Sequence, residues 1–217
     1  MPKALIVWGG WDGHEPEKGA RIVAEMLRGD GFDVRIENGT QAFAEPAHAG
    51  LDLIVPICSM SKIERVELEN LSLAVQSGVG LAGYHGGMAD AFREAVEYQF
   101  MVGGQWVAHP GNIIDYTVEI TRPDDPIMRG LPKSFPYRSE QYYLHVDPAN
   151  EVLATTTFSG DHAGWIKGVV MPVVWKRHHG EGRVFYSSLG HVTSEFNVTE
   201  MRTILHRGLL WAARKDR

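Results

Sequence analysis

The sequence predicts one α/β domain over residues 1–217, with three layers and a doubly wound, mainly parallel sheet in the middle. Strand-like apolar runs alternate with helical periods every ~25–30 residues in the first half, which is typical of βαβ units. Several of these runs are apolar throughout, as expected of strands covered on both faces. The 217 residues are 44% hydrophobic and 22% charged, a composition typical of a globular chain.

The first half predicts four strands and three helices. Lys3–Trp8 is a continuous apolar run that ends at a glycine pair, and the helical period after it closes at Gly29. The expected strands are 3–8, 32–37, 51–57 and 80–84, and the expected helices are 17–29, 63–77 and 89–98.

The second half changes character, because its strand candidates follow one another with few helices between them. The segment Asn112–Thr121 alternates apolar and polar residues, which indicates a strand with one buried face. Further strands are expected at 151–157, 169–176 and 183–188, and a closing helix at 194–214. No linker, repeat or low-complexity segment divides the chain, so a single domain is expected.

Composition and charge exclude several classes of partner. The net charge is -6, the pI is about 5.9 and no run of Lys and Arg occurs, so nucleic acids and membranes are not expected partners. No apolar run approaches the ~20 residues that span a bilayer. The start of the chain lacks the features of a signal peptide, so we expect a cytoplasmic protein. The single cysteine, Cys58, is expected to be a buried, inert thiol.

Ligands of open α/β sheets bind beyond the carboxyl ends of the strands, so the loops that follow the predicted strands are the candidate site. These loops are Gly9–His14, Cys58–Ser61 and Gly83–Gly87. The first of them does not form GxGxxG, so a dinucleotide is not expected.

The third loop places His85 between glycines in a Gly-x-His-x-Gly frame, after an apolar run and before a helix. This frame resembles a nucleophile elbow, but a histidine cannot serve as the acyl-accepting serine or cysteine. A helix N-terminus disfavours the cationic form of an imidazole, which suits a neutral base or a hydrogen-bond donor. We therefore expect an exposed, functional His85; the alternative is a histidine that only caps the turn.

Seven segments in order give the chain a resemblance to a known family over nearly its whole length. They are Gly9–His14, Gly83–Gly87, Gly103–Pro110, Asp125–Pro132, Glu140–Tyr143, Pro172–Trp175 and Gly182–His191. The sequence resembles the ThuA-like (trehalose utilisation) proteins. The resemblance implies a class I glutamine amidotransferase-like, flavodoxin-like fold without the amidotransferase cysteine, and a substrate among trehalose or 3-keto-disaccharides. Asp125 stands where the family commonly has histidine, so it is given no site role.

The candidate catalytic residues are His85, His191 and Glu140. His191 lies just past the strand 183–188 and shares a sheet edge with His85 if that strand is parallel to 80–84. We expect His14, His85, His109, His191 and Glu140 to line one cleft. Sugar rings stack on aromatic faces, and their hydroxyls need donors and acceptors. The candidate substrate-binding residues are Trp11, His14, His109, Gln141, Tyr143 and Trp175.

These residues predict an enzyme that transfers protons on a small-molecule carbohydrate, a sugar or keto-sugar, by isomerisation, elimination or hydrolysis. The alternative is a non-catalytic sugar-binding or regulatory module. A glutaminase is not expected, because the elbow lacks cysteine. No cofactor is predicted. The histidines have no local chelating spacing except His178–His179, and a zinc-like divalent metal and a homo-oligomer stay open as alternatives.

Overall fold

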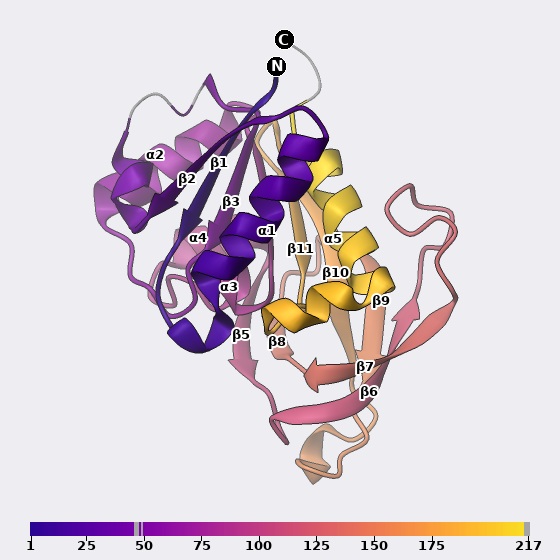
Figure 1. Cartoon of the computed structure of the whole chain (residues 1–217). Helices are drawn as coiled ribbons and strands as arrows, with labels where there is room; N and C mark the ends of the chain where they lie inside the picture. Colours follow the sequence, from indigo (N-terminus) through magenta and orange to yellow (C-terminus); the bar gives the residue numbers. More distant parts are fainter. Residues whose placement is uncertain (46–47, 49, 215–217) are drawn as a thin grey trace.

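The computed structural model describes residues 1–45, 48 and 50–214 of the chain. Within these residues a nine-stranded sheet runs in the order β2-β1-β3-β4-β11-β10-β9-β6-β7, and a two-stranded sheet pairs β5 with β8. Helices cover both faces of the large sheet (Figure 1), which confirms the three-layer α/β expectation.

One half of the large sheet is parallel and contains the strands that the apolar runs predicted. Strands β3 and β4 are buried at every position, as their continuous hydrophobicity requires. β11 pairs in parallel with β4, so both strands end at the same edge of the sheet. The strands are β2 (Asp33–Asn38), β1 (Lys3–Trp8), β3 (Leu53–Ile57), β4 (Gly80–Tyr84) and β11 (Gly182–Ser187).

The other half is antiparallel and extends the sheet beyond β11. Its strands are β10 (Val170–His179), β9 (Glu151–Thr157), β6 (Ile113–Ile120) and β7 (Ser134–Glu140). The sequence pattern missed β7, together with the small sheet of β5 (Gly104–Ala108) and β8 (Tyr143–Val146). β7 alternates buried and exposed positions, but Pro136 and the charged residues around it resemble a loop.

Two hydrophobic cores hold the helices on the sheet. α1 (Pro16–Gly29) and α5 (Thr199–Ala212) pack on one face through residues such as Leu27 and Leu205. α2 (Arg65–Gln76) and α4 (Val96–Val102) pack on the other through residues such as Leu71 and Met101 (Figure 1). None of the helices in the described ranges is long and apolar enough to cross a membrane.

The helix predicted at 89–98 is wrong. The chain forms a short helix α3 (His85–Ala89), breaks, and starts α4 only at Val96. In the break, Phe92 adopts a positive φ of 52°, and its N–H donates to the carbonyl of Ser61. This contact with the loop after β3 overrides the local helical period. The closing helix is likewise shorter than predicted, because 3₁₀ turns at Thr193–Asn197 precede α5.

Candidate functional site

His85 sits on a sharp turn between β4 and α3, as the glycine frame predicted. Its backbone has a φ of 46°, in the left-handed region that costs a non-glycine residue energy. The neighbouring Gly86 permits a close approach, because a Cβ there would lie 2.6 Å from Cε1 of His14. The turn therefore presents one imidazole and leaves room for a second.

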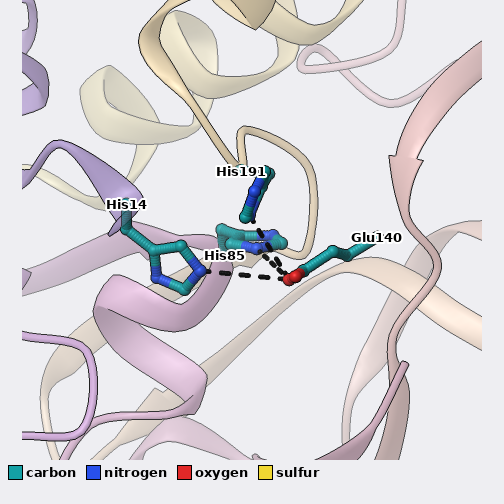
Figure 2. A group of neighbouring side chains, drawn as sticks. All are labelled: His14, His85, Glu140 and His191. Carbon is teal, nitrogen blue, oxygen red and sulfur yellow. Dashed lines mark hydrogen bonds and ion pairs between the residues drawn. The ribbon is translucent and has the colours of Figure 1, made fainter. Parts of the chain in front are cut away.

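Four side chains from distant segments converge at this turn (Figure 2). Oε2 of Glu140, at the end of β7, lies 3.1 Å from Nε2 of His85 and 3.4 Å from Nδ1 of His191. It also lies 3.9 Å from Nε2 of His14, in the turn after β1. We call His14, His85, Glu140 and His191 the imidazole–carboxylate cluster. The structure thus brings together four of the five residues that were expected to share a cleft.

Two imidazoles of the cluster are held by partners outside it, and the third residue is held through its backbone. Nδ1 of His85 donates to the carbonyl of Ser188 at 2.8 Å, and Nδ1 of His14 lies 2.6 Å from Oγ of Ser59. The backbone N–H of His191 donates to Oε2 of Glu195 at 3.1 Å. The rings of His85 and His14 are thus oriented by the protein itself.

Burial and mutual contact set the charges of the cluster. Burial lowers the pKa of His85 to about 4, although Glu140 opposes this shift, so the ring is neutral near pH 7. Burial by itself would raise the pKa of Glu140, but the surrounding side chains of His14, His191 and His85 hold it far below its usual value. Glu140 is therefore a carboxylate. The helix dipole, invoked from the sequence, is secondary to desolvation at His85.

The outer side of the cluster is formed by His109 and Trp11. Nε2 of His109 lies 3.7 Å from the other oxygen of Glu140, and its side chain is 28% exposed. Nδ1 of His109 is buried and has no hydrogen-bond partner among the described residues. Trp11 is 47% exposed, and its ring packs edge-to-face with the ring of His14, with 4.7 Å between the ring centroids. These two side chains are the ones a ligand would meet on approaching Glu140.

Three of the predicted substrate-binding residues have other roles. Trp175 is fully buried, and its Nε1 donates to the carbonyl of Val102, so this ring belongs to the core and cannot stack on a sugar. Gln141 is also buried, and its amide donates to Oγ1 of Thr156. Tyr143 packs its ring against Phe158. Trp175 lies on β10, a strand that was predicted but whose inward-facing positions were not, whereas Gln141 and Tyr143 lie at and after the junction of β7 and β8, which the sequence pattern had not located.

The expected exposure of His85 is wrong as well, because its side chain is 1% exposed. Tyr142 stacks on its ring at 4.1 Å between centroids and closes one side. Sequence reasoning gave no role to Ser59, Ser188 or Glu195, which contact the imidazoles of His14 and His85 and the backbone of His191. Ser59 and Ser188 lie within segments that the sequence singled out, but only the three-dimensional arrangement shows which residue each of them contacts.

A hollow of about 950 Å³ lies elsewhere, between α2 and the segment before α4. Its lining includes Met60, Leu73 and Arg93 but no member of the cluster. The cluster itself brings four potential ligand atoms, one from each member, within 4.8 Å of one another, and these residues could hold a metal ion.

The fold and the site together define a class of protein. It is a three-layer α/β protein in which the turn between β4 and α3 carries a histidine, and three further histidines and a glutamate gather around it.

The chain belongs to the ThuA family: a family model described as "Trehalose utilisation" matches residues 3–212. Among solved structures it is similar to a ThuA-like protein from Bacteroides uniformis, with a TM-score of 0.80 and 21% identity over 100% of this chain and 93% of that one. A ThuA-like protein from Parabacteroides merdae has a TM-score of 0.78 and 18% identity, with the same coverage.

A cytoplasmic protein from Salmonella typhimurium is more distant, with a TM-score of 0.64 and 15% identity over 99% of this chain and 100% of that one. At these identities the structures support the fold alone. No curated protein matches the sequence.

Proposed function

We propose that this protein is an enzyme of carbohydrate utilisation that transfers a proton on a sugar or keto-sugar at the imidazole–carboxylate cluster. The family model supports the sugar pathway as the setting. The Salmonella neighbour is described as cytoplasmic, and the cytoplasm is the location we propose here.

One observation carries the choice of an enzyme over a sugar-binding module. Nε2 of His85 and Oε2 of Glu140 lie 3.1 Å apart, so two titratable groups share a position from which a proton can be moved. A site that only bound sugar would gain nothing from burying a carboxylate against three imidazoles, because burial of ionisable groups is costly.

The chemistry most compatible with these groups acts on a carbon next to a ketone. A base removes the proton from that carbon, the electron pair moves onto the ketone oxygen, and a donor stabilises the resulting enolate. His85, His191 and Glu140 are the proposed proton-transfer groups. His109 and Trp11 are the proposed sugar-binding residues: His109 would contact the sugar through its ring nitrogens, and the exposed ring of Trp11 would stack on it.

Proton NMR in D₂O tests this proposal directly. The protein is incubated with 3-keto-trehalose, and with trehalose as a control that lacks the ketone. We expect the signals of the protons beside the ketone to disappear through exchange, or new products to form, at a rate proportional to enzyme concentration. Binding of the keto-sugar without exchange or product would favour the sugar-binding module instead.

A further inference from the structure

The imidazole–carboxylate cluster contains more nitrogen atoms than its own hydrogen bonds can satisfy. Nδ1 of His85 faces the carbonyl of Ser188, which can only accept, so this nitrogen carries the proton. With the proton on Nδ1, the lone pair of the ring is on Nε2, which faces Oε2 of Glu140 at 3.1 Å. Two acceptors held at this distance need a positive group between them.

Nδ1 of His191 is a second ring nitrogen near the same oxygen whose hydrogen-bonding capacity is not satisfied. This nitrogen is buried without a hydrogen-bond partner in the part of the chain that the structure describes, although it lies only 3.4 Å from Oε2 of Glu140. A single proton between His85 and Glu140 would leave this nitrogen unsatisfied, and an unsatisfied buried polar atom is costly. One cation in the middle of the cluster would satisfy His191, His85 and Glu140 together.

The spacing of the cluster also fits a cation. Tetrahedral ligands ~2.0–2.1 Å from a zinc ion are separated from each other by ~3.3–3.4 Å. The distances from Oε2 of Glu140 to the three imidazole nitrogens are 3.1, 3.4 and 3.9 Å, so small side-chain shifts would complete the geometry.

We propose that His14, His85, His191 and Glu140 bind one divalent transition-metal ion of the zinc class. Three imidazoles and one carboxylate suit zinc, cobalt or manganese, whereas magnesium and calcium prefer oxygen ligands alone. The outer contacts are those of metal-binding histidines, since His85 donates its second ring N–H to a backbone carbonyl and His14 contacts a serine hydroxyl.

This inference rests on the proposed function and assigns separate chemical roles to a metal ion and to the side chains of the same site. A metal ion would occupy the lone pairs of His85 and His191 and would serve as the electrophile at the sugar's ketone oxygen. With a metal ion bound, the proton-transfer role proposed above for His85 and His191 would pass to His109, which reaches the other oxygen of Glu140 at 3.7 Å.

Cobalt(II) titration of the chelator-treated full chain tests the metal site without any substrate. We expect one equivalent of Co²⁺ to bind, to give visible absorption bands, and to be displaced by Zn²⁺ but not by Mg²⁺. Glu140→Gln and His191→Ala should each weaken binding by at least ~100-fold, since losing a ligand costs more than losing an outer contact. Circular dichroism checks that each variant is folded.

His206→Ala is the matched control, because His206 also pairs with a carboxylate, at 2.6 Å from Asp30, outside the cluster. It should bind Co²⁺ like the original chain. Absence of stoichiometric Co²⁺ uptake by the original chain, or equal uptake by Glu140→Gln, would overturn the metal site. The proposed function is tested separately. If hydrogen exchange at the keto-sugar continues after chelator treatment, the function stands and the metal ion is not needed for it. If one equivalent of Co²⁺ binds but no exchange occurs, the metal site stands and the function does not.

Discussion

At the scale of single residues, Glu140 is the centre on which the candidate site depends. Four imidazoles approach its two oxygens, and the pKa of this carboxyl lies far below its usual value because of three of those contacts. The histidines differ in exposure, from 1% at His85 to 28% at His109. One carboxylate thus links a buried part of the site to an accessible part.

Replacing His85 separates the two roles open to it without a metal ion, proton transfer and polarisation of the substrate; loss of a metal ligand would instead lower Co²⁺ affinity together with turnover. His85→Ala should reduce turnover by ~10²–10⁴-fold, the range for loss of a positioned acid or base. His85→Gln keeps a hydrogen-bond donor without a titrating nitrogen, so substantial activity in this variant would mean that His85 only polarises the substrate. Turnover is measured by the NMR exchange assay, and a thermal melt accompanies it because the buried ring supports a strained turn. Unchanged turnover in both variants would reject a catalytic His85.

Gly86 offers a test that touches no side chain of the cluster. Gly86→Ala would place a methyl group 2.6 Å from Cε1 of His14, so the ring must move. We expect a folded protein with turnover and Co²⁺ affinity each lowered by ~10-fold or more, since displaced positioning groups have such costs.

The control for this variant is Gly29→Ala, at the end of α1, where a Cβ would meet no atom within 4 Å. Its activity should be unchanged, with a small gain in stability from the helix. Equal losses in the two variants would contradict the role assigned to Gly86.

At the scale of elements, the loops after β1, β3, β4 and β11 meet because these strands are parallel neighbours. Sequence pattern could predict this much: apolar runs locate the strands, and parallel strands end at one edge. It therefore predicted His14, His85 and His191 together. It could not place Glu140 on a strand, because β7 combines Pro136 with charged residues. It also could not tell which aromatic residues of the strands face the core.

A contact between two of these loops is expected to depend on pH. Oε2 of Glu15, after the turn that carries His14, accepts hydrogen bonds from the N–H and the hydroxyl of Thr193, near His191. Hydrogen bonds from Lys18 and Thr193 lower the pKa of Glu15 to about 2. Because this pKa is below the unfolded value of 4.5, the stabilisation is complete above that value and is lost as pH falls toward 2.

Urea unfolding measures this contribution. Glu15→Gln should lower the free energy of unfolding by about 1 kcal/mol at pH 7, the net contribution typical of a hydrogen bond. The difference from the original chain should shrink between pH 4.5 and pH 3. Glu17→Gln, whose partner Arg21 is exposed, should change stability little at either pH. A deficit in Glu15→Gln that stays constant over this range would contradict the assignment.

At the scale of the whole molecule, the site joins the two halves of the sheet. The parallel half supplies the three imidazoles of the cluster, whereas Glu140 comes from β7 at the far edge of the antiparallel half. Trp175 of β10 lies between α4 and β11 in the core, where its ring packs on Tyr186. The junction is therefore held by core packing as well as by the cluster.

Two tryptophan variants distinguish core from site. Trp175→Phe leaves the carbonyl of Val102 without its donor and should lower the free energy of unfolding by ~1–3 kcal/mol, with unchanged affinity for the keto-sugar. Trp11→Ala should weaken that affinity and change stability little, because the ring is 47% exposed. Chemical denaturation measures the free energy of unfolding, and calorimetric titration measures the affinity for the keto-sugar. Weaker sugar binding by Trp175→Phe with unchanged stability would show that Trp175 belongs to the site.

The contacts of the cluster join residues that are far apart along the chain: 45 positions for His14 and Ser59, 55 for His85 and Glu140, and 103 for His85 and Ser188. Such long loops must close before these contacts can form, so folding has to establish the topology of the sheet first. The cluster is then among the last parts to assemble. Substitutions in it should change the rate of unfolding and leave the rate of folding almost untouched.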